Sequence, residues 1–314
     1  MNSPLITVLM TVYNGDTYLS DAIESILNQT YINFEFLIID DASTDGSENI
    51  ILSFNDNRIR YIKNETNIGQ TASLNLGLKL AKGKYIARID QDDLSNENRL
   101  HVQCNYMEKN KNICIVGSWV KSINENNEYI CTITHPTDPH ILRESIVCGC
   151  PISHSSVFFD RKKILKIGGY PVKLKYAMDW GLWIECIKNN YTIVNIPIPL
   201  ASIRTHSNNF TSLKKLDLIK FTEQYQLFYQ SNTIAVKKST RKYANGLKNY
   251  LGLKLFYLYL KKGYFTNARK VFSKLTSENV LDIIPVAIKK IQMKSIKLKG
   301  RFKIEPISRK YYSQ

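Results

Sequence analysis

GKYIARIDQDD, residues Gly83–Asp93, is the stretch that decides the fold of this 314-residue chain. Its apolar first part predicts a buried β-strand, which runs directly into the carboxylates of Asp90, Asp92 and Asp93. Like charges this close repel one another unless a cation compensates them. A divalent ion with oxygen ligands, Mg²⁺ or Mn²⁺, is the natural candidate, and it commonly shares such a site with substrate phosphates. The alternative, and the more common role of an isolated Asp-x-Asp, is a solvated acidic turn that caps a helix beginning near Ser95.

Segments upstream of this stretch alternate between apolar runs rich in β-branched residues and amphipathic helical patterns. Such alternation predicts βαβ units and a parallel sheet with right-handed crossovers. Asp40-Asp41 and Asp90–Asp93 both follow predicted strands, so the two acidic loops should meet at the carboxyl edge of the sheet, where ligands of open α/β sheets bind. The predicted strands are 6–10, 34–39, 59–62 and 85–89, and the predicted helices lie within 19–27, 47–54 and 69–81.

The second half of the chain has a different pattern. Predicted strands at 113–120, 129–134, 156–159 and 191–203 and helices at 141–147 and 177–189 favour an α+β arrangement that completes the sheet with mixed strands. Beyond Thr211 the chain is predicted to be helical. We therefore expect an α/β fold with a mostly parallel central sheet flanked by helices, followed by an all-helical basic C-terminal region. The expected domains are 1–212, with halves 1–110 and 111–212, and 213–314.

The net charge of +16 belongs to the last third of the chain, because residues 214–314 hold 23 Lys/Arg and 5 Asp/Glu. Basic amphipathic helices can indicate an anionic membrane surface, nucleic acid or a solvated face. Each basic residue near an anionic leaflet contributes about 1 kcal/mol, so peripheral docking is possible without a membrane span. A structural helical cap is an equally good explanation. Nucleic acid is not expected, since the sequence has no aromatic RNP-like segment and no helix-turn-helix pattern.

A cytoplasmic location is expected, because no targeting signal and no apolar run of about 20 residues is evident. The first apolar run, Leu5–Val12, lacks a basic flank and is short for a signal peptide. The six cysteines are then expected to be reduced. Cys148-Gly149-Cys150 lacks the second matching pair that a zinc site needs.

Several short motifs follow one another along the first third of the chain. They are Thr11-Val12-Tyr13-Asn14, Tyr18-Leu19, SILNQTY (25–31), FEFLIIDDASTDG (34–46), Asn67-x-Gly69, Asn75-x-Gly77, AKGKYIAR (81–88) and Asp90-Gln91-Asp92-Asp93. This series resembles the family 2 glycosyltransferases over residues 5–103, and more weakly to about residue 210. The resemblance implies a GT-A fold, which is Rossmann-like, a nucleotide-diphosphate sugar donor, and Mn²⁺ or Mg²⁺ as the metal.

The resemblance also implies roles on the donor side. Thr11, Tyr13 and Asp41 match base-binding positions of the family, and Asp41 would read the uracil of a UDP-sugar. Tyr13 could stack on the base. Asn67 precedes a helix whose N-terminus could face an anion, although Gly69 beside it is also typical of a tight turn.

The metal is implied at the acidic motif. Asp90 and Asp92 match the Asp-x-Asp pair that holds the ribose and the metal on the diphosphate, and Asp93 matches a neighbouring position whose share in the metal site varies. Arg204-Thr205-His206 resembles the Arg-x-His segment that closes the domain. Either Arg204 or His206 would reach the diphosphate or the metal, and His206 is therefore a further expected metal ligand.

The acceptor side is implied by two later motifs. Asp179, in YAMDWGLW (176–183), matches the catalytic base, although Met178 departs from the usual Glu-Asp and puts one contact in doubt. CPISHSSV (150–157) resembles Asn-Pro-Ile-x-His-x-x-Val, with Cys150 in place of Asn. His154 would line the site or form a structural hydrogen bond. His154, Trp180 and Arg204 are the expected acceptor-side residues. The alternatives are helix capping for Asp179 and core packing for Trp180.

These expectations combine into an inverting, metal-dependent glycosyltransferase. It would move one sugar to a glycan or a lipid-linked glycan in cell-surface polysaccharide or lipooligosaccharide synthesis, peripherally on the inner face of the plasma membrane. One alternative is a nucleotidyltransferase, which predicts a Gly-rich loop with Lys or Arg after the first strand that this chain lacks. The other is a non-catalytic nucleotide- or lipid-binding protein, which the intact Asp90, Asp92 and Asp179 argue against.

Overall fold

The computed structural model describes residues 3–146, 150–174 and 177–206. The chain forms two compact units, Met1–Leu216 and Asp217–Gln314, and every described residue belongs to the first. The helices expected beyond residue 213 and the basic tail therefore lie outside the described residues. Among the helices that are described, none has the length and apolar character needed to cross a membrane.

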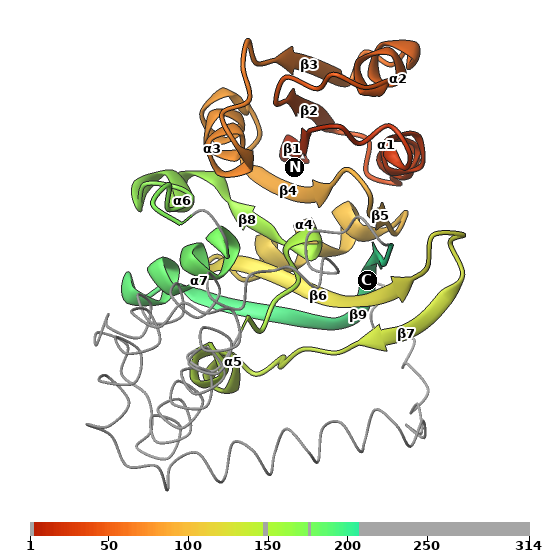
Figure 1. Ribbon diagram of the computed structural model, residues 1–314. Helices are drawn as coiled ribbons and strands as arrows, with labels where there is room; N and C mark the ends of the chain where they lie inside the picture. The colour runs from red at the N-terminus through yellow and green to blue at the C-terminus, as the bar shows by residue number, and fades with distance from the viewer. Residues whose placement is uncertain (1–2, 147–149, 175–176, 207–314) are drawn as a thin grey trace, which may run out of the picture. The chain divides into compact units, whose positions relative to one another are not determined.

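A sheet of nine strands runs through the described residues in the order β3-β2-β1-β4-β8-β6-β9-β5, with β7 paired to β6 (Figure 1). The four N-terminal strands pair in parallel, as predicted. Strand β8 joins them to the second half by antiparallel pairing with β4 and β6, and β6 pairs in parallel with β9. The strands are β1 (Ile6–Val12), β2 (Phe34–Asp40), β3 (Ile59–Lys63), β4 (Tyr85–Asp90), β5 (Leu94–Ser95), β6 (Ile113–Ile123), β7 (Tyr129–Ile133), β8 (Phe158–Asp160) and β9 (Thr192–Arg204).

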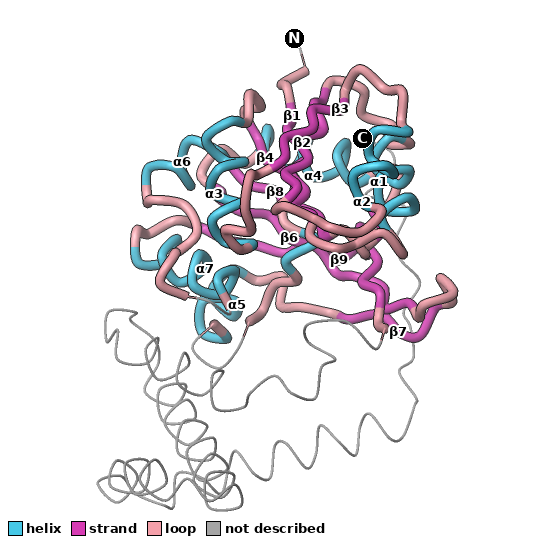
Figure 2. The backbone as a smooth tube through the Cα atoms, turned by 45° about the horizontal axis from the view of Figure 1, so that its top comes forward, coloured by secondary structure: helices cyan, strands magenta, loops and turns pink. Residues whose placement is uncertain are grey.

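Helices lie on both sides of this sheet. In both views α3, α6 and α7 lie along one side, and α1 and α2 lie along the other (Figures 1 and 2). The mixed second half and the mostly parallel α/β sheet agree with the predicted fold class. The helices are α1 (Leu19–Leu27), α2 (Ser47–Ser53), α3 (Gln70–Leu80), α4 (Arg99–Lys109), α5 (Pro139–Ser145), α6 (Arg161–Lys166) and α7 (Met178–Lys188), and a 3₁₀ turn covers His154–Ser156.

The helix expected near Ser95 begins later, at Arg99. Residues Leu94–Ser95 instead form β5, which pairs with Ser202 and Ala201 of β9. The Ser95 N–H donates to Ser25 Oγ over 3.0 Å. The acidic stretch therefore continues into the sheet, and pairing with β9 prevents it from acting as the cap of a solvent-exposed helix.

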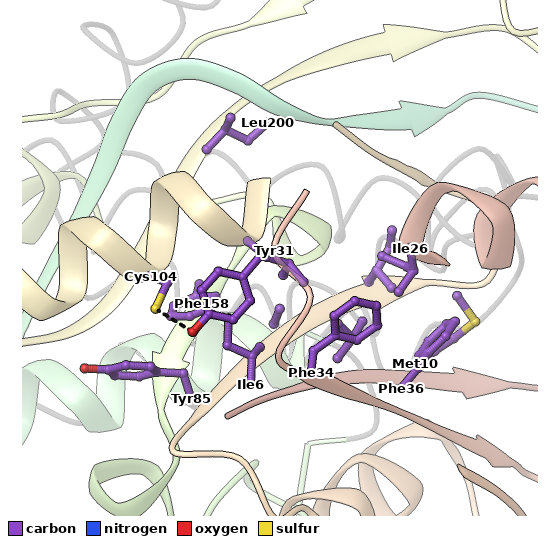
Figure 3. Close-up of a cluster of buried hydrophobic side chains, with 14 of the residues drawn as sticks. Ile6, Met10, Ile26, Tyr31, Phe34, Phe36, Tyr85, Cys104, Phe158 and Leu200 are labelled. Atoms are coloured by element: carbon purple, nitrogen blue, oxygen red, sulfur yellow. Dashed lines mark hydrogen bonds between the residues drawn. The ribbon is translucent and has the colours of Figure 1, made fainter. Parts of the chain in front are cut away.

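One hydrophobic core extends through both halves of the described unit. Figure 3 shows Ile6 and Met10 of β1 beside Phe34 and Phe36 of β2, with Ile26 of α1 packed against them. The same cluster continues to residues of α4, β8 and β9, which are Cys104, Phe158 and Leu200. Because the halves share this core, residues that are far apart in sequence are fixed relative to one another at the sheet edge.

Two glycines allow close contact with β1. A Cβ on Gly77 of α3 would lie 2.3 Å from Leu9 Cδ1, and a Cβ on Gly83 would lie 2.3 Å from the backbone nitrogen of Thr7. The Gly83 contact is the more restrictive, because β1 is a central strand and its backbone cannot yield as a side chain can. The motifs Asn75-x-Gly77 and AKGKY thus have a packing explanation.

We expect Gly83→Ala to destabilise the protein by about 1–3 kcal/mol, since overpacking forces a shift of the β1 backbone. The matched control is Gly46→Ala, because the nearest atom to a Cβ there, Asp16 Cβ, is 3.6 Å away. Its backbone φ of −73° also suits alanine, so its effect should stay below about 1 kcal/mol. Urea denaturation of both variants measures the difference, and equal stability of the two would contradict the packing argument.

Candidate active site

The carboxyl ends of β1, β2 and β4 bring the two acidic loops together, as predicted. Thr11 lies opposite Ile39 on one side and Asp90 on the other, and Val12 lies opposite Asp40. The loops that follow β2 and β4 therefore flank the end of β1 (Figure 1). This is the edge at which open α/β sheets bind ligands.

Asp41 is held by donors from the loop before α3 and from α3 itself. Its Oδ1 accepts hydrogen bonds from Asn64 Nδ2, Ile68 N and Ser73 Oγ over 2.8–2.9 Å, and its Oδ2 accepts one from Gly69 N over 2.8 Å. The residue is only 3% exposed. Within the described residues, Oδ2 thus keeps capacity for one further donor, such as the N–H of a base.

The turn around Asn67 serves Asp41 directly. Gly69 has φ +87°, a left-handed conformation that favours glycine, and it directs its own N–H and that of Ile68 to the Asp41 carboxylate. These two amides are therefore engaged within the protein. The Asn67 side chain is exposed, and its expected contact with the donor stays a prediction.

Thr11 carries a buried hydroxyl with no hydrogen-bond partner in the described part of the chain. A buried polar atom of this kind is rare and points to a missing partner such as a ligand or water. Its neighbour Asp40 is fully buried and accepts hydrogen bonds from Ser43 N and Tyr61 Oη over 2.9 Å each, which indicates a structural role. The base-binding role expected for Thr11 is compatible with a hydroxyl that has no partner among the described residues.

Tyr13 is 49% exposed at the end of β1 and is fixed through its backbone. The Gln91 side-chain amide accepts from Tyr13 N over 2.8 Å and donates to Tyr13 O over 3.2 Å. A Cβ on Gly15 would lie 2.4 Å from Gln91 Cδ, so glycine leaves room for this contact. Gln91, between the aspartates of the motif, therefore holds the loop that presents the Tyr13 ring to solvent.

Asp90 is bound by Arg88, which precedes it by two residues on β4. The guanidinium donates to both carboxylate oxygens, and Arg88 is 1% exposed. Ser155 Oγ also donates to Oδ2 over 3.0 Å, and Gln70 Nε2 donates to Oδ1 over 3.2 Å. Four donors thus occupy the carboxylate, and a metal contact of Asp90 stays a prediction that requires exchange with one of them.

Asp92 and His206 form the pair that best suits a metal. Asp92 Oδ2 lies 3.0 Å from His206 Nε2, and the side chains are 24% and 10% exposed. Burial, together with the charge of Asp90, raises the pKa of Asp92, and His206 opposes this rise. In the described part of the chain no group of three His, Cys, Asp or Glu side chains could hold a metal ion by itself. Carboxylates and imidazoles both ligate divalent metals, so this pair is the candidate for the expected Mn²⁺ or Mg²⁺, and metal binding by it stays a prediction.

Asp93 and Arg204 are joined at the end of β9. Asp93 is buried and accepts a hydrogen bond from Arg204 N over 2.9 Å. Burial, with the charges of Asp92 and Asp90, raises the pKa of Asp93 well above its usual range. The Arg204 side chain donates to Asp92 O over 3.0 Å, Asn127 Oδ1 over 2.5 Å and Asp21 Oδ2 over 3.2 Å. Arg204 thus ties together the motif, α1 and the β6–β7 hairpin, and its expected acceptor role stays a prediction.

Asp179, the expected catalytic base, lies in the first turn of α7. Its Oδ2 is 3.7 Å from Cys150 Sγ, which also donates to Ile152 O over 3.2 Å. Burial raises the pKa of Asp179, while the Trp180 N–H and the Arg88 charge act against the rise. The Arg88 guanidinium, which binds Asp90, therefore also influences the pKa of Asp179. A raised pKa suits a group that must accept a proton.

His154 and Trp180 both make internal hydrogen bonds. His154 Nε2 lies 2.8 Å from Tyr170 Oη, and the His154 ring contacts Trp183 with the centroids 6.0 Å apart. Burial and the Arg88 charge lower the pKa of His154 well below its usual range. Trp180 Nε1 donates to Ile146 O over 2.8 Å, and the ring is buried. Both geometries favour the structural alternatives, and acceptor contacts for these residues stay predictions.

Three residues that position the motif, Arg88, Gln91 and Ser155, were not singled out from the sequence for a role. A signal existed for Arg88, because a charged residue inside an apolar strand, two positions before Asp90, must share its face. Ser155 and Gln91 offered no such signal, since their partners depend on the tertiary fold.

The ion pair of Arg88, which is buried, and Asp90, whose side chain is 30% exposed, should show strong energetic coupling. Asp90→Asn leaves the buried Arg88 charge without its partner, so it should cost about 3 kcal/mol, and the double variant Arg88→Met/Asp90→Asn should cost less than the two single changes together. A double-mutant cycle in urea measures this. The exposed pair Lys63–Glu48, 2.6 Å apart, is the control and should couple by less than about 1 kcal/mol. Equal coupling in both pairs would contradict the assignment.

Known proteins provide an independent comparison. The profile described as "Glycosyl transferase family 2" matches residues 7–172. An uncharacterised glycosyltransferase of Methanocaldococcus jannaschii is 35% identical over 70% of this chain and 78% of its own length. The Escherichia coli enzyme WfgD, named as a UDP-Glc:alpha-D-GlcNAc-diphosphoundecaprenol beta-1,3-glucosyltransferase, is 32% identical over 79% of this chain and 100% of its own length.

Solved structures support the fold. TarS 1–349 of S. aureus in complex with UDP-GlcNAc aligns with a TM-score of 0.62 at 17% identity, covering 79% of this chain and 72% of that chain. The mannosyltransferase PcManGT of Pyrobaculum calidifontis, in complex with GDP-Man and Mn²⁺, aligns with a TM-score of 0.58 at 16% identity, covering 100% of this chain and 83% of that chain. The expected GT-A fold is thereby confirmed, and the sequence matches show that this chain belongs to glycosyltransferase family 2.

Proposed function

We propose that this glycosyltransferase transfers one sugar, with inversion, from a nucleotide-diphosphate sugar to a hydroxyl of a glycan or lipid-linked glycan. The observation that carries the proposal is the Asp92–His206 pair, set at the same sheet edge as the unpartnered Thr11 hydroxyl. The Asp92–His206 pair would suit a metal on the diphosphate, and the Thr11 hydroxyl would suit the nucleoside. WfgD is named for a UDP-sugar, and TarS was solved with one, which favours UDP over other nucleotides.

The donor would bind across the ends of β1, β2 and β4. Asp41 Oδ2 would accept a hydrogen bond from the N–H of the base, the unpartnered Thr11 hydroxyl would form a hydrogen bond with the nucleoside, and the Tyr13 ring would stack on the base. The donors that hold Asp41 Oδ1 fix the carboxylate in advance, so little ordering remains for binding. Asp90 would face the ribose, and Asn67 would lie beside the nucleotide.

Asp92 and His206 would hold Mn²⁺ or Mg²⁺, and PcManGT with GDP-Man and Mn²⁺ offers a parallel for such a metal. A bound metal would neutralise the charge that develops on the departing diphosphate. Asp90 and Asp93 are proposed as further contributors only if they leave Arg88 and the Arg204 N–H, respectively. The protein's own part is to hold the two ligands side by side.

Asp179 would act as the general base. Its carboxylate takes the proton of the acceptor hydroxyl while that oxygen bonds to the anomeric carbon, and the bond from this carbon to the diphosphate breaks. The nucleoside diphosphate leaves with the electron pair of that bond, and the single displacement inverts the anomeric configuration. The Cys150 thiol beside Asp179 would help to orient the carboxylate.

We also propose that the acceptor is lipid-linked and that the protein meets it at a membrane surface. WfgD is named for a diphosphoundecaprenol acceptor, which lies in a membrane. A peripheral position on the inner face of the plasma membrane would bring this chain to such an acceptor, and the 23 Lys/Arg of residues 214–314 would favour an anionic leaflet. His154, Trp180 and Arg204 would shape the acceptor side, mostly by fixing its loops.

A thermal-shift screen of UDP, GDP, dTDP and CDP, each with and without Mn²⁺, tests the donor and metal proposal. Ligands that bind the native state raise its apparent stability. We expect one nucleotide, UDP in the first place, to raise the melting temperature. This rise should grow when Mn²⁺ is added, and the additional rise with Mn²⁺ should be lost in Asp92→Asn. Asp179→Asn should keep the full shift and lose about 10²- to 10⁴-fold in turnover. A folded protein that responds to no nucleotide would contradict the proposal.

The pH dependence of kcat/KM tests Asp179 as the base. The base must be deprotonated to act, so activity falls as pH drops through its pKa. Because burial raises this pKa, the acid limb should lie above the value of about 3.9 for an ordinary aspartic acid. Cys150→Ala removes a donor that favours the carboxylate and should move the limb to higher pH. A limb that moves to lower pH, or does not move, would contradict this role.

A further inference from the structure

His206 is held by more than Asp92. The Tyr18 ring lies against the His206 ring with the centroids 4.8 Å apart and the planes inclined by 46°. Tyr18 is the residue at the N-terminal cap of α1 and lies far from His206 in the sequence. Leu19 is fully buried, which anchors the helix start in the core.

The same ring also contacts Arg204. The Arg204 guanidinium carbon lies 4.5 Å from the centroid of Tyr18, at a distance typical of a cation–π contact. Arg204 is 1% exposed and donates to Asp92 O and to Asp21 Oδ2 of α1. Tyr18 therefore lies between the residue that fixes the backbone of the acidic motif and the imidazole that faces its carboxylate.

We propose that Tyr18 is a positioning residue that sets the His206 ring for metal binding with Asp92. The inference rests on the proposed metal site. Outer partners that orient a ligating histidine typically change metal affinity by about 10- to 100-fold when they are removed. Here the aromatic face limits rotation of the imidazole, and Arg204 holds the Tyr18 ring and the Asp92 backbone in one unit. The start of α1 thereby contributes to a site formed by β4 and β9.

Two substitutions separate the ring from the rest of the side chain. Tyr18→Phe keeps the aromatic face, while Tyr18→Leu keeps apolar bulk at the helix start but removes the ring. Electron paramagnetic resonance titration of Mn²⁺ into the full chain, with whichever of UDP, GDP, dTDP or CDP stabilises it most, gives the Mn²⁺ affinity. We expect Tyr18→Leu to bind Mn²⁺ about tenfold more weakly and Tyr18→Phe to bind it within about twofold of the wild type.

A second readout needs neither metal nor nucleotide. The ring current of Tyr18 acts on the His206 ring at 4.8 Å, so the His206 Cε1–H signal should move in Tyr18→Leu and stay in place in Tyr18→Phe. The signal is identified by its loss in His206→Gln. Tyr129→Leu is the matched control, because Tyr129 is 56% exposed on β7 and should change neither the signal nor the Mn²⁺ affinity.

The outcomes distinguish this inference from the proposal beneath it. Wild-type Mn²⁺ affinity in Tyr18→Leu, with Mn²⁺ bound normally by the wild type, would overturn the role of Tyr18 alone. A wild-type protein that binds no Mn²⁺ with any of the four nucleotides would overturn the metal site and this inference together. A His206 signal that moves equally in Tyr18→Leu and Tyr129→Leu would also contradict positioning by the ring.

Discussion

Mutual repulsion of three carboxylates within four residues is the constraint on which the site depends. The structure resolves it by giving each carboxylate a different partner. Asp90 binds the buried Arg88 guanidinium, Asp92 faces His206, and Asp93 accepts the backbone N–H of Arg204. Only Asp92 is thus paired with a group that can itself bind a metal. The division leaves the Asp92 carboxylate and the His206 imidazole as the pair for the metal ion that we propose, while Asp90 and Asp93 are engaged by protein donors.

The partners explain why the sheet continues beyond its parallel half. Ser155, which supports Asp90, lies in the 3₁₀ turn before β8, and Arg204 and His206 lie at or just after the end of β9. Pairing of β8 with β4, and of β5 with β9, carries these residues to the acidic motif. The shared core fixes this arrangement, so the acidic edge of the N-terminal half is completed by residues from the second half. The Arg88 guanidinium, which binds Asp90, also acts against the rise in the pKa of Asp179.

Local sequence patterns were sufficient for the parallel half of the fold and for the meeting of its acidic loops. Apolar strands that end in Asp40-Asp41 and Asp90–Asp93 define both the elements and the edge. The sequence carried a signal for Arg88 as a partner of Asp90, but it could not show that Ser155 also binds Asp90 or that the Arg204 N–H binds Asp93, because only the tertiary fold brings these residues close. Arg204 illustrates the limit, because the resemblance implied a contact with the diphosphate or the metal but could not show that its side chain also binds Asp21, Asn127 and the Asp92 carbonyl. The helix expected to start near Ser95 begins at Arg99 instead, because long-range pairing with β9 determines the conformation of Leu94 and Ser95.

The most direct test of this division is a crystal structure of the protein with Mn²⁺ and a nucleoside diphosphate, with anomalous scattering recorded at the manganese edge. We expect an anomalous peak bonded to Asp92 and His206, while the Asp90 carboxylate remains on Arg88. A manganese ion bonded to Asp90, with Arg88 displaced, would contradict it, as would a peak that has no contact with Asp92.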